Sequence, residues 1–227
     1  MNSSSPPEVL NGLLAQRHSC RAFLTDPVPR EVQESLLQMA QRTASWCNSQ
    51  PWQVHITEGA ATKRLRDVLR TAPQPGESGS DFPWPREYRG VYLERRRECG
   101  FALYDSVGIV RGDREASARQ AQENFRLFGA PHVAIITSDE ALDVYGAIDC
   151  GAYVANFLLA ATSLGVATIP QAALASRSQQ LRRFFDLGDD RRVVCGISFG
   201  YADTAHPANG FRTSRATISA AAAWVSA

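Results

Sequence analysis

The sequence predicts one globular domain in which helices dominate and short strands lie between them. Of its 227 residues, 44% are hydrophobic and 21% charged, which is an ordinary composition with enough apolar material for a sizeable core. Apolar residues recur at helical spacing along most of the chain, interrupted by short runs typical of strands. The formal net charge of +1 gives no reason to expect nucleic acid or an anionic membrane as a partner.

Helices are the main elements expected up to residue 128. They are predicted over residues 9–16, 29–43, 62–69, 88–110 and 113–128. Pro29 suits the first helical position of the second helix, because its missing N–H would have no partner there. The run 53–57 alternates and contains β-branched residues, so it is predicted to be a strand.

A long apolar segment, residues 144–170, follows a buried strand predicted from Pro131. The segment is long enough to cross a bilayer, but Asp149, Asn156 and three glycines interrupt it. We therefore expect a fully buried helix at the centre of a soluble fold, or at a subunit interface. The remaining elements are predicted as a strand over 167–169, a helix over 178–185 and a strand over 192–200.

Two segments are expected to lack regular structure. Residues 1–8 are interpreted as a short flexible lead, with neither the basic start nor the apolar stretch of an export signal. Residues 71–89 combine proline and glycine with Phe82, Trp84 and Tyr88. This excursion is either a lid over a site or a surface loop pinned by its aromatic side chains.

The five cysteines are an odd number, with no CxxC pair and no zinc-like spacing. We expect free thiols in a reducing, cytoplasmic compartment. The four histidines show no metal-ligand spacing, and no metal is predicted. His132 precedes a buried strand and is interpreted as structural. Asp149, within the apolar segment, has either a functional or a hydrogen-bonding role, because buried charge is costly.

Two arginine-containing motifs lie near opposite ends of the chain. In RHSCRAF, residues 17–23, Arg17, Ser19 and Arg21 alternate, so an extended backbone would present them to one side. In HPANGFRTSRA, Arg212 and Arg215 flank Thr213 and Ser214. Guanidinium groups match the oxygens of a phosphate. The motifs therefore suggest either one phosphate site or two solvated, unrelated basic segments.

The stretch SWCNSQPW, residues 45–52, places a cysteine between a tryptophan and an Asn-Ser-Gln-Pro-Trp run. A catalytic Cys47 would need a nearby base or a lowered pKa, and no histidine is positioned by sequence to supply one. The alternative is that Cys47 is a bystander and the polar residues around it form the site.

Four blocks together resemble the FMN-dependent nitroreductase family. They are RHSCRAF, ASWCNSQPWQV, the IPQAALA segment and GYADTAHPANGFRTSRA, and they occur in the family's order from Arg17 to Arg215. The resemblance implies an α+β fold with a mainly antiparallel central sheet surrounded by helices. It also implies a homodimer with FMN at the subunit interface, and the long apolar helix at that interface.

The resemblance also implies which residues hold the cofactor. Arg17, His18, Ser19 and Arg21 would bind the FMN phosphate and ribityl groups, with Arg215 and Arg212 also reaching the phosphate. Other FMN contacts would come from Ser45, Trp46, Asn48 and Gln50, the first two from the partner subunit, and from Pro170, Gln171, Ala172 and Ala173. Ala172 is the expected backbone donor to flavin N5, where a fixed dipole tunes hydride transfer.

The implied activity is ping-pong reduction of nitroaromatic or quinone-type acceptors, with NADPH or NADH as the hydride donor. No side chain is expected to act as a catalytic acid or base. Phe82, Trp84 and Tyr88 are tentative substrate-pocket residues. The alternatives are a specialised dehalogenating or flavin-consuming relative and a non-catalytic FMN-binding or storage protein. The physiological acceptor and the choice between NADH and NADPH stay open.

Overall fold

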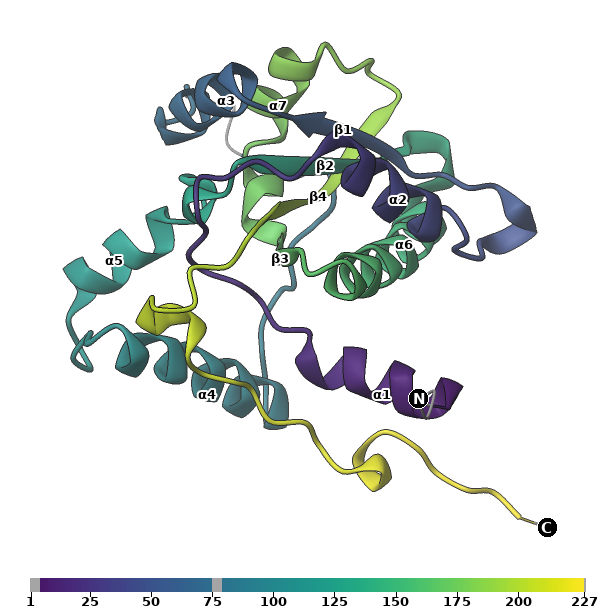
Figure 1. Cartoon of the computed structure of the whole chain (residues 1–227), viewed down its shortest axis with the longest axis vertical. Helices are drawn as coiled ribbons and strands as arrows, with labels where there is room; N and C mark the ends of the chain where they lie inside the picture. The colour runs from purple at the N-terminus through teal and green to yellow at the C-terminus, as the bar shows by residue number, and fades with distance from the viewer. Residues whose placement is uncertain (1–4, 75–78, 227) are drawn as a thin grey trace.

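One four-stranded antiparallel sheet forms the centre of the molecule and carries helices on both faces (Figure 1). The computed structural model describes residues 5–74 and 79–226. Across the sheet the strands run β1 (Gln53–Thr57), β2 (His132–Asp139), β4 (Arg191–Gly200) and β3 (Ala167–Gln171). All three neighbouring pairs are antiparallel. The predicted α+β fold with a mainly antiparallel sheet is confirmed.

The helices agree in order with those predicted. Their bounds are α1 (Pro6–Gln16), α2 (Arg30–Ala40), α3 (Ala60–Arg70), α4 (Val91–Ser106), α5 (Arg114–Gln122), α6 (Asp143–Ser163) and α7 (Ser178–Phe185). Short 3-10 helices also occur, namely η1 (Trp46–Asn48), η2 (Leu127–Gly129), η3 (Glu140–Leu142), η4 (Ala172–Ser176), η5 (Pro207–Asn209) and η6 (Ile218–Ala220).

Strand β2 shows why the sheet is covered on both faces. Its residues are almost all buried, and successive side chains of a strand point to opposite faces. Ala134 and Ile136 belong to the core cluster formed with α2 and α6, whereas Val133 and Ile135 belong to the cluster formed with α3 and α7. A continuous apolar run is therefore what this position requires.

Helix α6 departs from the expectation of complete burial. One side packs against the sheet and α2, with Cys150, Tyr153 and Phe157 buried. The opposite side is open, and Val144, Tyr145 and Ile148 are each more than half exposed. Its length and mean hydropathy of 1.4 also meet the criteria for a membrane span. The buried side is that of a core helix, and the described residues leave the apolar side chains opposite it largely uncovered.

Two further boundaries differ from the prediction. Helix α5 ends at Gln122, and a turn over 123–126 follows it. Leu127 and Phe128 then adopt left-handed backbone conformations, which cannot continue a right-handed helix to Phe128, and both side chains are buried. Helix α1 begins at Pro6, so residues 6–8 of the expected lead are helical, while residues 1–4 lie outside the described residues. Pro6 lies in the first turn, where its missing N–H costs nothing.

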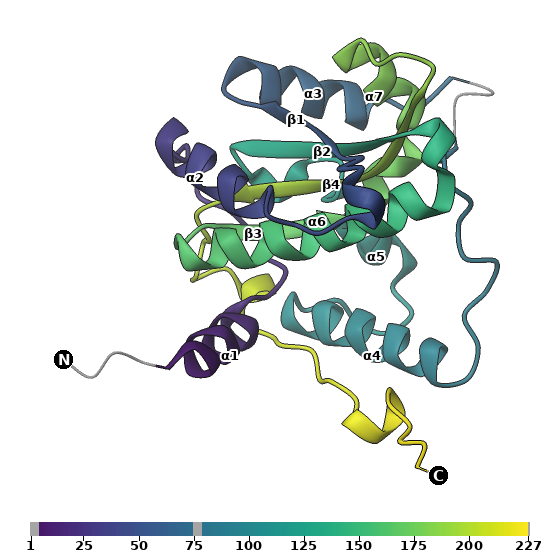
Figure 2. The ribbon, with the colours of Figure 1, turned by 90° about the vertical axis from the view of Figure 1, so that its right-hand side faces the viewer.

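Helices α1, α4 and α5 and the C-terminal segment lie together beyond the β3 edge of the sheet (Figures 1 and 2). None of these three helices contains a fully buried residue. The C-terminal segment passes between α1 and α4 and then leaves the body, with Trp224 and Val225 over 90% exposed. This outer group frames the space beside β3.

The excursion predicted over 71–89 crosses from α3 to α4, and residues 75–78 lie outside the described residues. Asp81 anchors this excursion to the rest of the protein. The Asp81 carboxylate accepts the Val193 N–H at 2.7 Å and lies 3.2 Å from the guanidinium of Arg182. The described part of the excursion is therefore anchored on the α7 side of the sheet.

Candidate functional site

The RHSCRAF segment runs along the free edge of β3. The Cys20 N–H donates to the carbonyl of Thr168 at 2.9 Å, and Ser19 forms a parallel bridge with Thr168. The backbone at Ser19 and Cys20 is thus extended, which is the condition under which Arg17, Ser19 and Arg21 were expected to point to one side. Cys20 is buried against this edge, whereas its neighbours Ser19 and Arg21 line cavities that residues of α1, α4 and α5 also line.

The C-terminal arginine motif returns to the same place. The Arg21 guanidinium lies over the ring of Phe211, 5.2 Å from its centroid. A cavity of about 320 Å³, here called the arginine cavity, is lined by Leu14, Ala15, Arg17, His18, Ser19, Arg21, Cys99, Phe211, Arg212, Thr213 and Arg215. The two motifs that are most distant in sequence therefore form one concave surface.

The electrostatics of the arginine cavity favour an anion. Partial burial and the nearby charge of Arg215 both lower the pKa of the Arg17 guanidinium. Burial is also the main cause that lowers the pKa of Arg21. Within the described part of the chain, none of the four cavity arginines forms an ion pair with a carboxylate. Converging, unneutralised guanidinium groups are the donor set that a phosphate requires.

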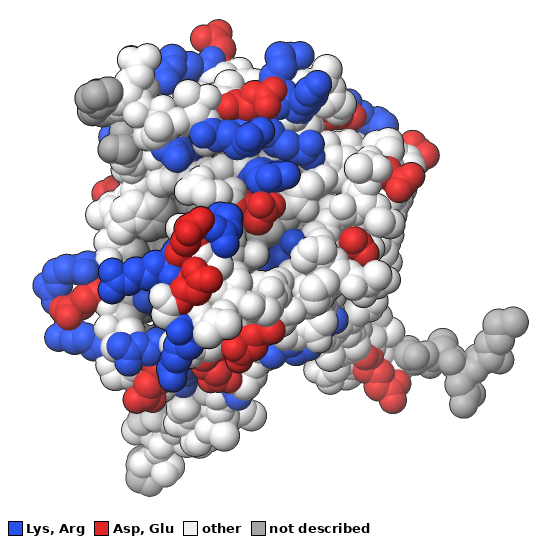
Figure 3. Space-filling model, turned by 90° about the vertical axis from the view of Figure 1, so that its left-hand side faces the viewer, with Lys and Arg blue, Asp and Glu red and all other residues white. Residues whose placement is uncertain are grey.

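The outer surface offers a contrast. On the face shown in Figure 3, Lys and Arg side chains are interspersed with Asp and Glu. Exposed ion pairs of the same kind occur in α5, between Arg119 and Glu115, and just beyond it, between Arg126 and Glu123. A mixed surface of this kind is typical of a solvated face. The unpaired arginines of the cavity are therefore a distinct feature.

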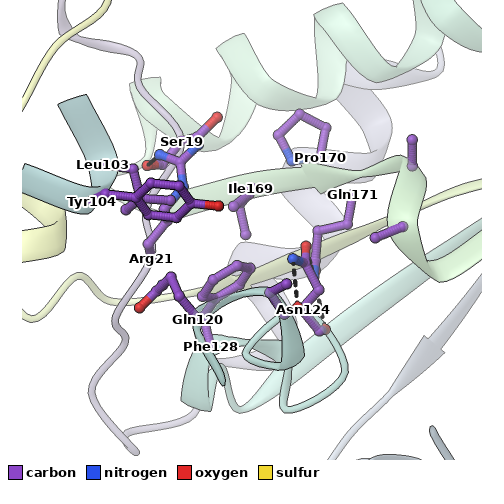
Figure 4. A pocket seen from close by; sticks show the side chains of 13 residues that line it. Ser19, Arg21, Leu103, Tyr104, Gln120, Asn124, Phe128, Ile169, Pro170 and Gln171 are labelled. Atoms are coloured by element: carbon purple, nitrogen blue, oxygen red, sulfur yellow. Dashed lines mark hydrogen bonds between the residues drawn. The ribbon is translucent and has the colours of Figure 1, made fainter. Parts of the chain in front are cut away.

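A second cavity of about 300 Å³, here called the strand-end cavity, adjoins the first and shares Ser19 and Arg21 with it. Its other lining residues are Leu103, Tyr104, Gln120, Ala121, Asn124, Phe128, Ile169, Pro170, Gln171, Ala172 and Ala173 (Figure 4). Cofactor sites typically occupy about 300–1,000 Å³, and the two cavities together reach this range. The predicted segment 170–173 thus lies next to the arginines.

Ala172 and Ala173 begin the 3-10 helix η4 directly after β3. The first N–H groups of a helix have no acceptor inside their own helix. Both residues line the strand-end cavity, and Ala172 is exposed. The first N–H groups of η4 are therefore available at the cavity wall where Ala172 was expected to donate to flavin N5.

The side chain of Gln171 is engaged within the protein. It is 2% exposed, its Nε2 donates to the Asn124 carbonyl at 2.9 Å, and its Oε1 accepts the Ser198 hydroxyl at 2.5 Å. These bonds tie the end of β3 to the turn after α5 and to β4. Gln171 also lines the strand-end cavity, so these bonds hold the cavity wall in place, and its predicted contact with the cofactor stays a prediction.

Several lining residues were missed by the sequence analysis, chiefly Tyr104 and Leu103 of α4 and Gln120 and Asn124 at and beyond the end of α5. In Figure 4 the Tyr104 hydroxyl points toward the middle of the cavity. The i, i+4 spacing of Gln120 and Asn124 places them on one side of the helical path, but such pairs are common on any helix. No sequence signal would have singled them out.

The residues of SWCNSQPW line neither cavity. Ser45–Gln50, here called the Ser45–Gln50 turn, lies on the side of the sheet away from α4 and α5 (Figure 1). It is attached to the exposed side of α6. The Trp46 N–H donates to the Asp149 carboxylate at 3.1 Å, and the Trp46 ring packs edge-on against Tyr145 at 4.5 Å. Asp149 thus has the hydrogen-bonding role that was one of its two predicted alternatives.

The Ser45–Gln50 turn has a strained backbone. Cys47, Asn48 and Gln50 have φ values of 52°, 54° and 48°, a conformation that costs most residues about 1–2 kcal/mol. The Ser45 hydroxyl accepts the Gln50 N–H at 2.9 Å and helps to hold the turn. Trp46 remains 60% exposed. Strain of this kind is characteristic of segments shaped for a contact.

The tentative substrate-pocket residues Phe82, Trp84 and Tyr88 also lie outside both cavities. Trp84 and Tyr88 are about half exposed, and the Arg96 guanidinium lies over the Tyr88 ring, 5.2 Å from its centroid. Within one chain, the aromatic and apolar walls beside the predicted ring position come instead from Tyr104, Phe128 and Ile169.

The sulfur atoms take no part in a recognisable catalytic group. All five cysteines are free. Burial raises the pKa of the Cys150 and Cys195 thiols to about 12, as expected for small core residues. Cys47 is exposed at the surface turn. Among the described residues, no group of three or more His, Cys, Asp or Glu side chains could hold a metal ion.

Comparison with known proteins agrees with this geometry. Residues 14–201 match the Nitroreductase family. The chain belongs to the nitroreductase family. It is 38% identical over 210 residues to nitroreductase NfnB of Mycolicibacterium smegmatis, covering 91% of this chain and 88% of that protein. It is 31% identical to 4-nitrobenzoate reductase of Pseudomonas putida, covering 90% of each.

Among solved structures of nitroreductases, that of the FMN-dependent NfnB from Mycobacterium smegmatis in complex with NADPH superimposes with a TM-score of 0.92. The two chains are 34% identical, and the match covers 98% of this chain and 100% of that one. The nitroreductase fold therefore extends over nearly all of the chain, including the outer helices.

Proposed function

We propose that this protein is an FMN-dependent oxidoreductase that reduces nitroaromatic or quinone-type acceptors with NAD(P)H. The observation that carries the proposal is the convergence of four arginines without carboxylate partners on a cavity that continues to the η4 backbone donors. When bound, FMN would accept hydride from the nicotinamide and deliver electrons to the acceptor. The relatives named above support the same reaction class.

The residues present fit FMN. In this proposal, Arg17, Arg212 and Arg215 neutralise the phosphate, and Ser19 and Arg21, which line both cavities, meet the ribityl chain. The first N–H groups of η4 donate to the polar edge of the ring. No side chain is assigned to proton transfer. The contribution of the protein is to orient the ring, neutralise the phosphate and exclude water.

We further propose that the protein works as a cytoplasmic homodimer, in which the whole chain acts as one domain and the excursion over 71–89 contributes to the pocket. The uncovered apolar side of α6 and the strained turn attached to it support this assembly. In the dimer, Ser45, Trp46, Asn48 and Gln50 would approach the cavities of the partner subunit. In this assembly, these four residues would make their predicted FMN contacts in the site of the partner subunit.

The test is spectroscopic. Purified protein should carry flavin absorbance that bleaches on adding NADPH and recovers on adding a nitroarene or a quinone. Parallel titrations with NADH and NADPH identify the donor, and the NADPH complex of the Mycobacterium relative supports NADPH. Colour that never bleaches would indicate a binding protein instead. Colourless protein that cannot be reconstituted with FMN would contradict the proposal.

A further inference from the structure

Asn209 lies between the two arginine motifs and contacts both. It ends the short helix η5 and is 7% exposed. Its Oδ1 accepts the backbone N–H of Arg21 at 2.6 Å, across 188 positions of sequence. Its Nδ2 donates to the carbonyls of Ala22 at 2.9 Å and Asp203 at 2.8 Å. Three of the four hydrogen bonds that an asparagine side chain can form to neighbours are therefore made.

The main chain of Asn209 acts on the second motif. Its carbonyl accepts a hydrogen bond from Nη1 of Arg212 at 2.8 Å. One residue thus fixes the backbone at Arg21 through its amide and the side chain of Arg212 through its carbonyl. Both arginines line the arginine cavity.

The convergence of the arginines needs such support. Both Arg17 and Arg215 line the arginine cavity, and burial first and the charge of Arg215 second lower the pKa of Arg17. Without a ligand, these like charges favour separation of the two motifs. Arg212 and Arg215 follow η5 in an extended segment, and neither lies in a regular helix or strand. A buried carboxamide with three partners is a rigid connection between such segments.

We propose that Asn209 is the positioning residue of the phosphate site, which holds the two arginine motifs in the register that lets them bind one phosphate. This inference rests on the proposed function, since the phosphate is that of FMN. Asn209 itself does not line either cavity and would act through Arg21 and Arg212.

A separate set of contacts keeps the chain folded around Asn209. Phe23 bridges Ala202, the Leu24 N–H donates to the Tyr201 carbonyl at 2.9 Å, and the Asp203 N–H donates to the Ala22 carbonyl at 3.0 Å. These backbone pairs join the same two segments without the asparagine side chain. Removal of the carboxamide should therefore loosen the arginine register while the fold persists.

The experiment compares two flavins that differ only in the phosphate. Apoprotein of the parent and of Asn209→Ala is titrated with FMN and with riboflavin, and flavin fluorescence gives both dissociation constants. The ratio of riboflavin Kd to FMN Kd measures the phosphate contribution. In Asn209→Ala this ratio should fall by about tenfold or more, because the phosphate loses charge-assisted bonds that riboflavin never makes. Riboflavin affinity should fall less than FMN affinity, since only the contact of Arg21 with the ribityl chain, which both flavins carry, is weakened.

Gln180→Ala is the matched control. Gln180 is also a buried carboxamide, and its Nε2 donates to the carbonyls of Val68 and Thr71 at 2.9 and 3.1 Å, away from the arginines. In Gln180→Ala, the ratio of riboflavin Kd to FMN Kd should equal that of the parent protein. Because the same folded fraction binds either flavin, partial unfolding of a variant cancels in the ratio.

Three results would overturn the inference. An unchanged ratio of the two dissociation constants in Asn209→Ala would show that the arginines keep their positions without the Asn209 side chain. An equal loss of affinity for both flavins would indicate a merely structural role. Failure of both Asn209→Ala and the milder Asn209→Ser to fold would show that the backbone pairs do not suffice. A parent protein that binds FMN and riboflavin equally would instead contradict the proposed phosphate site itself.

Discussion

The arginine cavity and the Ser45–Gln50 turn were predicted as parts of one site, yet they differ in how the chain completes them. The cavity is assembled within one chain, where residues 17–21 and 211–215 meet beside β3. The turn stands on the opposite side, with a strained backbone and an exposed Trp46. The turn lines neither cavity of its own chain. This difference supports the proposal that the predicted site is divided between subunits.

The largest effect is expected from Ile148→Glu on the open side of α6. Ile148 is 58% exposed and lines neither cavity, so a single-chain site would tolerate the change. If α6 is the subunit interface, a buried unpaired carboxylate should convert the dimer to a monomer and remove most of the flavin. Sedimentation and flavin absorbance measure both. An Ile148→Glu protein that stays dimeric and keeps its full flavin content would contradict a site shared between two subunits.

The arginines should come next. Arg17→Ala and Arg215→Ala each delete a charge-assisted bond worth roughly 1.5–3 kcal/mol, which corresponds to about 10- to 100-fold weaker FMN binding. Flavin occupancy after gel filtration is the measurement. Arg119→Ala, which removes an exposed arginine paired with Glu115, is the control and should retain flavin. Parent-like occupancy in both cavity variants would contradict the phosphate assignment.

Variants of Asn48 separate two properties of the Ser45–Gln50 turn, namely its backbone conformation and the side-chain amide of Asn48. Its φ of 54° suits asparagine and glycine but not alanine. Asn48→Gly should keep the turn and lose the amide, whereas Asn48→Ala should lose the amide and add about 1 kcal/mol of strain. A several-fold loss of flavin affinity in both variants would support a contact by the amide. Loss in Asn48→Ala alone would assign the effect to the backbone.

A smaller effect, that of pH on stability, is expected from His132, a buried residue of the sheet that lines neither cavity. Burial lowers the pKa of His132, whose Nε2 accepts the Val28 N–H at 3.0 Å. The folded state therefore favours the neutral ring, and the unfolded chain binds more protons below about pH 6.5. Thermal stability should fall as pH falls below that value. His132→Asn should flatten this dependence; an unchanged slope would exclude His132 as its source.

The smallest effect is expected from Cys47→Ser. Cys47 lies within the turn, and its thiol makes no hydrogen bond with the described residues. Flavin content, turnover and oligomeric state should match the parent. A loss of turnover with flavin retained would reinstate the thiol as a catalytic group.

The parts of the molecule that sequence predicted well are those fixed by local pattern. The strand Gln53–Thr57 and the helix Ser178–Phe185 have the bounds predicted, because alternation and helical spacing are properties of a short window. The structural role of His132 is likewise confirmed. The motifs carrying Arg17 and Arg215 were placed in one site through a resemblance, and the geometry brings them together.

What sequence could not predict depends on tertiary contacts. The left-handed turn at Leu127 and Phe128 ends a helical pattern because both side chains gain burial in the core. The role of Gln171 follows from partners 47 and 27 positions away. The open side of α6 has the same composition as a buried side, so periodicity alone could not identify it.

The meeting of residues 17–21 with 211–215 also has a consequence for biosynthesis. While residues 211–215 are still inside the ribosomal tunnel, the growing polypeptide presents only two of the four arginines that line the arginine cavity. All four strands of the sheet, the last ending at Gly200, are made before that segment. On the proposed function, a chain cut after residue 210 would keep the strands and lose Arg212 and Arg215, so capture of the flavin phosphate would depend on a segment synthesised after the whole sheet.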